Sequence, residues 1–257
     1  MVQTFANANC EAGTNKIGNV AAEQFSERIK ERYSRSTVNV VSTSTKTMGG
    51  VGYQNLSGYS DGGVVADDGA IVLRPNGNAY LGSNWRPNIA DSVFTEKGIT
   101  SRNNTIVYSM PSGTMVIDAD INVQTGSLSG PGQVSGVVIV ADKVLISSNV
   151  SYINATIVAN EVNTCAFKAD GSAMSFSELK WTGSASYPCA KPLQFDAPVS
   201  TKRIILNRTA GANNGVGSIV RAEIFNFNTA QYLWSFSQMA RYNQAVTTFS
   251  RELPPRY

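Results

Sequence analysis

Residues 134–163 read VSGVVIVADKVLISSNVSYINATIVANEVN, and this stretch decides the fold. It divides into the hexads VSGVVI, VADKVL, ISSNVS, YINATI and VANEVN, and nine of the ten residues at first and fifth hexad positions are β-branched, Tyr152 being the exception. After three hexads, or 18 residues, the motif VADKV at 140–144 returns as VANEV at 158–162. The repeat predicts that the chain regains the same position every three hexads.

A sequence period of this kind favours a β-solenoid, in which each repeat stacks on the one before it. We therefore expect a mainly β protein built around a single-stranded parallel β-helix with three-sided coils of about 18 residues. Each side would be one short strand and a corner, with the first and fifth hexad positions pointing into a narrow core. An antiparallel meander would explain the apolar alternation but not the repeat, and the sequence leaves the handedness of the coil open.

The solenoid is expected to span residues 105–209. Upstream, residues 36–104 contain short β-like runs between glycine-rich turns. One of these turns contains Asn76-Gly77, a hairpin signal. We interpret this part of the chain as an antiparallel or irregular β-region.

The two ends of the chain depart from the hexad pattern. Within an N-terminal segment, residues 1–35, the stretch 19–34 has apolar side chains every four residues and predicts an amphipathic helix. Such a helix suits either a cap on an open coil end or the stub of an anchor helix. Residues 210–257 are rich in aromatic side chains and predict a packing tail with a strand at 222–227.

Composition limits the partners. Only 15% of the 257 residues are charged, and the net charge of +3 is scattered rather than gathered in a basic stripe, so nucleic acid is not an expected partner. No apolar run approaches the ~20 residues of a membrane span, so the sequence predicts no transmembrane segment in this chain. We expect an export signal to lie outside the given residues.

The chain has three cysteines. Cys165 and Cys189 bracket a Ser/Gly-rich insertion, and we expect a disulfide between them if the protein is exported. The alternative is two buried free thiols. Cys10 would then remain as a free thiol or an attachment point.

The chain contains no histidine, which limits its catalytic chemistry. The hexads resemble those of hexapeptide-repeat acyltransferases, whose base is a histidine, so that mechanism is excluded. Ser-His-Asp catalysis, Cys-His catalysis and most zinc sites are excluded for the same reason.

Carboxylates leave one catalytic alternative open. Asp118 and Asp120 are expected to share a strand face, with Asp142 and Lys143 on a neighbouring coil, as a polysaccharide-cleaving site would require. The competing interpretation is that these residues occupy corners and bond the local backbone. No cofactor is expected; calcium would suit such carboxylates, but no further feature of the sequence supports it.

Aromatic residues of the 36–104 region could add a ligand surface. Tyr80 and Trp85, with Tyr53 and Tyr59, would form a sugar-stacking platform if they are exposed. Aromatic side chains in β-structure more often pack against neighbours. Tyr80, Trp85, Asp118, Asp120, Asp142 and Lys143 are therefore the candidate ligand or partner surface.

The series VVIVADKVLISSNVSYINATIVANEVNTC, with LNRTAG, AEIFNF, YLW and the terminal RELPPRY, resembles the C-terminal region of exported proteins of candidate phyla radiation (Saccharibacteria-like) bacteria. The resemblance covers residues 105–257. It implies a secreted or cell-surface β-helical protein and brings no catalytic or ligand residues.

Three functions follow as hypotheses. The first is a non-enzymatic structural or adhesive surface protein, whose coil serves as a spacer or a display surface towards a host-cell surface or glycan. The second is a carbohydrate-binding or polysaccharide-cleaving module. The third is a self-associating polymer or surface-layer subunit, since open coil ends present unpaired strand edges.

Overall fold

The protein is mainly β, as the sequence predicts. The computed structural model describes residues 3–4, 44–56, 64–65, 71–82, 105–122, 136–175, 177–178, 187–209 and 221–226. Within these ranges the chain forms 13 strands and no helix. The predicted helix at 19–34, Cys10, Tyr59 and Trp85 lie outside the described residues.

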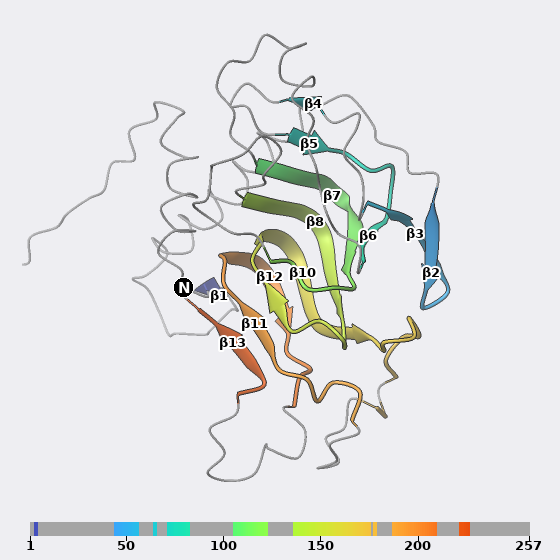
Figure 1. Ribbon diagram of the computed structural model, residues 1–257, viewed down its shortest axis with the longest axis vertical. Coiled ribbons are helices and arrows are strands. Elements are labelled where there is room, and N and C mark those ends of the chain that lie inside the picture. Colours follow the sequence, from blue (N-terminus) through green and yellow to red (C-terminus); the bar gives the residue numbers. More distant parts are fainter. Residues whose placement is uncertain are drawn as a thin grey trace, which may run out of the picture.

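Most strands belong to one long sheet with parallel neighbours (Figure 1). Its centre consists of β7 (Thr105–Ile117), β8 (Gly136–Ser147), β10 (Thr156–Phe167) and β12 (Val199–Ile205), which are paired in parallel in the order β7, β8, β10, β12. These segments are rich in Val, Ile and Thr, whose branched side chains suit extended backbone. Because adjacent strands of this sheet run in parallel, the chain must return to the starting end of the sheet between one strand and the next. We call one such passage of the chain a circuit.

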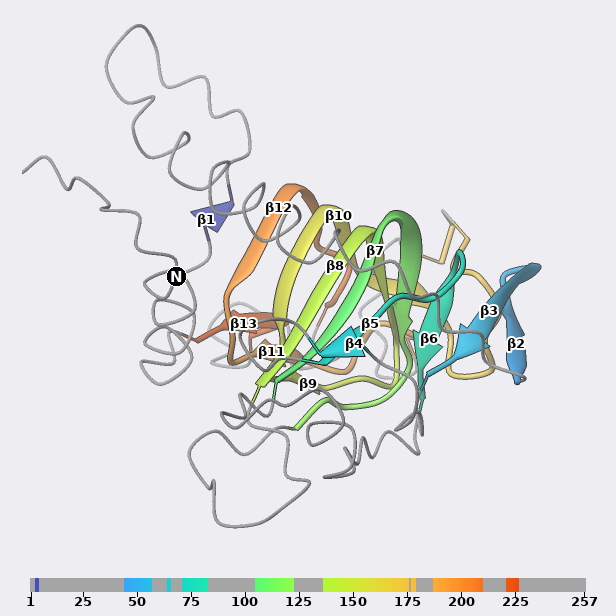
Figure 2. The same ribbon diagram turned by 90° about the horizontal axis from the view of Figure 1, so that it is seen from above.

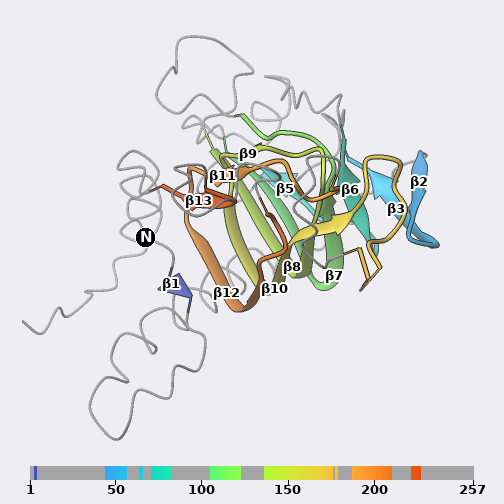
Figure 3. The same cartoon turned by 90° about the horizontal axis from the view of Figure 1, so that it is seen from below.

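A second, three-stranded sheet completes that circuit. It contains β9 (Tyr152–Ile153), β11 (Leu193–Phe195) and β13 (Glu223–Phe225), all parallel. Along the chain, β8, β9, β10, β11, β12 and β13 alternate between the two sheets. Figures 2 and 3 show the long strands arching around one side, with the three short strands on the other.

Each long strand bends near its middle. In β8 the core side chains are Ile139 and Ala141 before the bend and Val144 and Ile146 after it. Two successive residues, Asp142 and Lys143, lie between them and are partly or fully exposed, so the alternation of faces changes phase there. In β7 the register shifts between Met110 and Thr114.

The bends divide the protein into three walls around one core. The first wall is β5 (Ile71–Leu73) with residues 105–110, 136–141, 156–159 and 199–201. The second wall is β6 (Ala79–Leu81) with residues 114–117, 143–147, 161–163 and 203–205. The third wall is β9, β11 and β13. Inward side chains of all three walls form one apolar cluster.

As far as Asn163, the register of β8 against β10 is the one that the repeat predicts; beyond it the register shifts, and Phe167 pairs with Ser147. Val140 pairs with Val158, and Val144 pairs with Val162, each partner lying 18 residues further along the chain. The pairing therefore places VADKV beside VANEV. The methyl groups of equivalent residues therefore lie on adjacent strands, and such strands are about 4.8 Å apart.

The hexad assignment of inward positions is wrong in part. Val144, Ile146, Val150 and Val162 lie in the core, as expected. On the first wall the core residues are instead Ile139, Ala141, Ile157 and Ala159, and on the third wall Ile153 replaces Tyr152. Val138, Val140, Thr156 and Val158 alternate with the first-wall core residues and are buried on the opposite face. The bends cause the error, because each shifts the two-residue period by one position.

The N-terminal strands extend the long sheet. β2 (Thr45–Met48) and β3 (Val51–Asn55) form an antiparallel hairpin whose turn residues Gly49 and Gly50 have φ of 55° and 79°, and β3 pairs with β6. β4 (Val64–Val65) pairs with β5 in antiparallel fashion, and β1 (Gln3–Thr4) pairs with β12 at the other edge.

The Asn76-Gly77 turn does not close a hairpin. The strands on either side of it, β5 and β6, both pair in parallel with β7, one on the first wall and one on the second. The turn is therefore a corner between two walls. Gly77 has φ 94°, a conformation that favours glycine at this corner.

Candidate functional site

Asp118 and Tyr80 are brought together by Lys46. Asp118 directly follows β7, is only 8% exposed, and its Oδ2 accepts a hydrogen bond from Lys46 Nζ at 2.5 Å. The same ammonium lies 5.5 Å from the centroid of the Tyr80 ring. Lys46 belongs to the β2–β3 hairpin, so the contact fastens that hairpin to the second wall. The sequence gives no sign of Lys46, which lies 72 residues from Asp118.

Asp120 binds the neighbouring turn rather than joining Asp118. Its Oδ1 accepts hydrogen bonds from the backbone N–H groups of Ser151 (2.6 Å) and Tyr152 (3.0 Å), and its Oδ2 accepts one from Ser151 Oγ (2.9 Å). The expectation that Asp118 and Asp120 share a strand face is wrong, because β7 ends at Ile117 and both residues lie in the turn after it. Turns recruit Asp for this backbone bonding.

Asp142 and Lys143 lie at the bend of β8, apart from the Asp118 turn. Asp142 Oδ1 accepts a hydrogen bond from Asn160 Nδ2 at 2.7 Å. Lys143 is exposed and pairs in register with Glu161, which pairs in turn with Arg203. The side chains of Glu161 and Arg203 form an ion pair at 3.3 Å. A row of alternating charge therefore runs across the second wall, with the modest stabilisation of exposed pairs.

The predicted disulfide is present between Cys165 and Cys189. Their Cα atoms are 6.0 Å apart, and both residues are fully buried. Tyr187 packs against them. The disulfide joins the two ends of the insertion. Along the chain, this insertion lies between β10, which contributes to the second wall, and β11 of the third wall.

Arg208, absent from the candidates drawn from the sequence, holds the corner beside the disulfide. It is 5% exposed and donates hydrogen bonds to four backbone carbonyls, those of Ser147 (2.7 Å), Ser148 (2.8 Å), Thr164 (2.7 Å) and Lys191 (3.1 Å). These carbonyls belong to two successive circuits of the chain. Only a planar group with five N–H donors can serve so many acceptors at once. No local pattern marks Arg208, because its partners are 17 to 61 residues away.

The charge of Arg208 is buried but balanced. Burial lowers the pKa of Arg208 to about 10, and the carboxylates of Glu223 and Asp120 oppose this. Glu223 Oε1 accepts hydrogen bonds from the Arg208 backbone N–H (2.8 Å) and from Thr164 Oγ1 (2.9 Å). The guanidinium therefore stays charged at neutral pH and is satisfied by carbonyl dipoles and a nearby anion.

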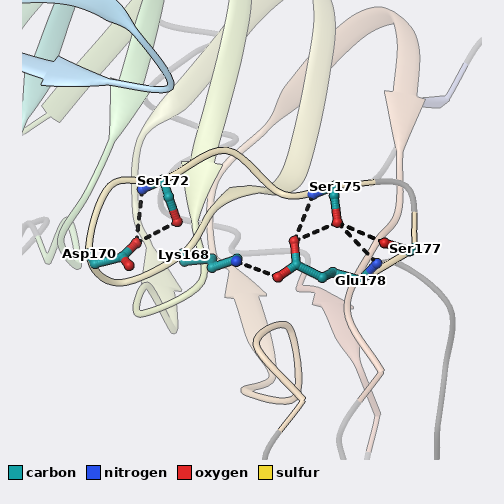
Figure 4. Close-up of polar contacts among 6 residues, drawn as sticks. All are labelled: Lys168, Asp170, Ser172, Ser175, Ser177 and Glu178. Carbon is teal, nitrogen blue, oxygen red and sulfur yellow. Dashed lines mark hydrogen bonds and ion pairs between the residues drawn. The ribbon is translucent and has the colours of Figure 1, made fainter.

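Polar residues within the insertion form hydrogen bonds and an ion pair with one another (Figure 4). Glu178 accepts hydrogen bonds from the Ser175 N–H (2.9 Å) and Oγ (2.6 Å), and the Glu178 N–H bonds back to Ser175 Oγ (3.4 Å). This reciprocal Ser-x-x-Glu arrangement is a capping box. Lys168 also pairs with Glu178. The bonds from Lys168 and Ser175 lower the pKa of Glu178 to about 2.

A polar row lies on the outer face of the third wall. Asp196 accepts hydrogen bonds from Tyr152 Oη (2.7 Å), Gln194 Nε2 (2.9 Å) and Asn226 Nδ2 (2.8 Å). Burial raises the pKa of Tyr152 to about 12, with help from Asp196. Burial also raises the pKa of Asp196, but the hydrogen bonds from its three donors outweigh that effect, so the pKa of this carboxyl is lowered. Tyr152, Gln194 and Asp196 are half-buried and Asn226 is exposed, so solvent reaches this polar row.

The described residues contain no group of three or more Cys, Asp and Glu side chains that could hold a metal ion. Within the same ranges no helix is long and apolar enough to cross a membrane.

Comparisons with protein-family models, curated proteins and solved structures found no match to the chain. The resemblance to exported proteins of candidate phyla radiation bacteria stays a prediction.

Proposed function

We propose that this protein is a non-enzymatic structural or adhesive β-solenoid, a stiff spacer or display surface of a secreted or cell-surface protein. The observation that carries the proposal is the circuit of the chain, which passes through three walls and returns in parallel register beside its previous turn. On the third wall, Phe195 stacks on Phe225 of the next circuit, with ring centroids 4.8 Å apart. Such nearest-neighbour stacking produces rods whose length follows the number of coils.

The contacts of the three candidate aspartates also support a structural role. Asp118 anchors a hairpin, Asp120 bonds a turn, and Asp142 bonds the equivalent residue of the next strand. Each carboxylate thus has a structural partner, and the three do not converge on one point. A catalytic pair would require two carboxyl groups facing a common substrate position.

The disulfide supports an exported setting. Bonds between cysteines form and persist in oxidising compartments, and they are rare where thiols are kept reduced. A buried Cys165–Cys189 bridge therefore suits a protein that works outside the cytoplasm. Localisation of the full gene product by cell fractionation tests this part of the proposal.

Binding and turnover assays on the full chain test the function itself. We expect saturable binding to immobilised host-cell membranes or to a glycan array, with no release of reducing sugar from any bound polysaccharide. If the protein releases reducing sugar from a polysaccharide and Asp120→Asn abolishes that release, the proposed structural function is overturned. The matched control is Ser151→Ala, which removes one donor to the same carboxylate and leaves the carboxylate in place.

Carbohydrate binding without cleavage is the second candidate, and the polar row of the third wall favours it. Tyr152, Gln194, Asp196 and Asn226 combine donors, an acceptor and an aromatic ring on one partly exposed face. Such combinations suit sugar hydroxyl groups. This candidate would be favoured by a glycan that protects these residues from hydrogen exchange. Tyr152→Ala should weaken the binding of that glycan at least tenfold.

Self-association is the third candidate. β1 pairs with only two residues of β12, Ser200 and Thr201, whereas Arg203, Ile204 and Ile205 of the same strand pair with β10 alone among the described strands. Strand edges of this kind are sites of further pairing. Light scattering across a concentration series tests it: a mass that stays that of one chain excludes end-to-end assembly.

A further inference from the structure

Rows of paired residues cross the second wall and end on β12, the outermost of the long strands (Figure 2). Each row takes one residue from β8, one from β10 and one from β12. One row is Lys143, Glu161 and Arg203, and the next is Val144, Val162 and Ile204. Beyond β12, β1 pairs only with Ser200 and Thr201 of the first wall, and no other described strand pairs there. Residues 202–206 therefore form a strand edge, which we call the β12 edge.

The apolar row is open to solvent at this edge. Val144 and Val162 are fully buried, whereas Ile204, which occupies the same inward position on β12, is only partly buried. The third wall shows the same difference, because Phe195 is fully buried and Phe225, which stacks on it, is only partly buried. The core of the last described circuit therefore retains exposed apolar area that a further strand would bury.

The charged row favours a carboxylate beyond Arg203. Along this row the sign of the charge alternates, and Glu161 Oε2 lies 3.3 Å from Arg203 Nη1. The Arg203 side chain is nevertheless 69% exposed, and Lys202, the residue before it, is exposed as well. Opposite charges directly across neighbouring strands stabilise them, while like charges are destabilising. A strand that adds to the β12 edge is therefore favoured if an acidic residue lies opposite Arg203.

The neighbours of β12 indicate the direction of an added strand. β10 on one side and β1 on the other both run parallel to β12. An extended peptide that adds to an open edge gains main-chain hydrogen bonds, and its side chains give specificity. At the bend, Thr201 Oγ1 donates to the Arg203 C=O at 2.8 Å and accepts from the Arg203 N–H at 3.4 Å. We therefore expect Arg203 to act through its side chain and main-chain pairing to lie at residues 204–206.

We propose that the β12 edge docks an extended segment of a partner protein, which lies parallel to β12 with a carboxylate opposite Arg203 and an aliphatic residue opposite Ile204. β10 presents this same combination, Glu161 and Val162, to the other side of β12. This docking rests on the solenoid proposed above and deepens its display role, because it assigns the end of the coil and the chemistry of the partner. A second copy of this chain is the competing occupant of the same edge.

The test titrates a fluorescent synthetic peptide into the full chain. Its sequence is TIVADEVN, that of residues 156–163 with aspartate in place of Asn160, so that both Lys202 and Arg203 meet acidic residues. We expect saturable binding in fluorescence anisotropy and greater amide-exchange protection of Ile204 and Leu206. The peptide TIVAKKVN, which places like charges opposite the edge, should not bind.

A charge exchange tests the register. Arg203→Glu should weaken the binding of TIVADEVN at least tenfold. The same variant should bind TIVADKVN, in which lysine takes the place of the glutamate, more tightly than the intact protein does. The matched control is Lys143→Glu, which reverses a charge of the same row inside the sheet and should leave the affinity for TIVADEVN within about twofold.

Nuclear Overhauser contacts of Val162 with Val144 and with Ile204 establish the inward row without reference to binding. If these contacts are present but the peptide does not bind, or the charge exchange has no effect, docking is overturned while the solenoid stands. If the contacts are absent, both are overturned. A mass of two chains in light scattering, which Arg203→Glu returns to that of one, would assign the β12 edge to a second copy and overturn docking of a partner.

Discussion

Asp142 and Asn160 occupy the same position in neighbouring strands and are joined by a 2.7 Å hydrogen bond, 18 residues apart. The repeat is therefore expressed in a side-chain contact as well as in the backbone register. Because the bond lies where β8 and β10 bend, it fixes two corners to each other. Equivalent residues of neighbouring parallel strands can stabilise one another in this way wherever their side chains are complementary.

Removal of either partner at this corner should lower stability. We expect Asp142→Ala and Asn160→Ala each to reduce the free energy of unfolding by about 1 kcal/mol, and the double variant to cost less than their sum. Urea denaturation measures all three. The adjacent exposed residue provides the control, since Lys143→Ala should change stability by less than about 0.5 kcal/mol. Fully additive losses would show that the bond is not formed.

Arg208→Met should be far more damaging. It removes the donors that satisfy the carbonyls of Ser147, Ser148, Thr164 and Lys191 in a buried corner. We expect a loss of about 3 kcal/mol or more, since buried acceptors left unpaired keep their desolvation cost. The matched control is Arg203→Met, an arginine with a 69% exposed side chain and one ion pair, for which about 0.5 kcal/mol is expected. Equal losses in chemical denaturation would contradict the described role of Arg208.

The disulfide should stabilise the fold mainly through the unfolded chain. Closing a loop with a separation of 24 residues is worth about 3 kcal/mol in the chain-entropy description. We expect the Cys165→Ser, Cys189→Ser variant to lose about that amount in urea denaturation. A thiol assay should find one reactive thiol per unfolded chain before reduction and three after it, given the three cysteines of the sequence. Three thiols before reduction would contradict the bridge.

Acid should loosen the insertion before it unfolds the parallel sheet. The pKa of Glu178 is lowered from 4.5 to about 2, so the charged carboxylate is the form that the insertion favours. Its contribution is complete above pH 4.5 and is lost as the pH falls towards 2. The amide resonance of Ser175, which donates to Glu178, should report this change. In Glu178→Gln the same resonance should not titrate over this range; a persistent transition would assign the effect to another group.

Alkali should act on the third wall through Tyr152. Its pKa is raised from 10.0 to about 12, so folding favours the protonated phenol that donates to Asp196. That contribution is present below pH 10 and is lost as the pH rises towards 12. Difference absorbance of phenolate between the intact protein and Tyr152→Phe should show a late-titrating tyrosine. A difference spectrum that titrates near the ordinary tyrosine pKa would mean that the Tyr152–Asp196 bond is absent.

Much of the candidate surface could not be predicted from local sequence. Asp118 and Asp120 stand out in the sequence as two nearby carboxylates, but their partners depend on where β7 ends. Lys46 reaches Asp118 from 72 residues away, and only the folded hairpin brings it there. Tyr80 packs near Lys46, in keeping with the packing alternative rather than an open platform.

The sequence by itself determined the β class and the 18-residue register of β8 on β10, and it predicted the pairing of Cys165 with Cys189 for an exported protein, a disulfide that the structure confirms. Those properties depend on residue type at repeated or bracketing positions, which a single chain displays directly. Only the tertiary structure decided which face of each wall is inward and how Arg208 closes the corner. The reason is that each bend shifts the two-residue period of a strand, and that a buried guanidinium finds its acceptors only after successive circuits have stacked.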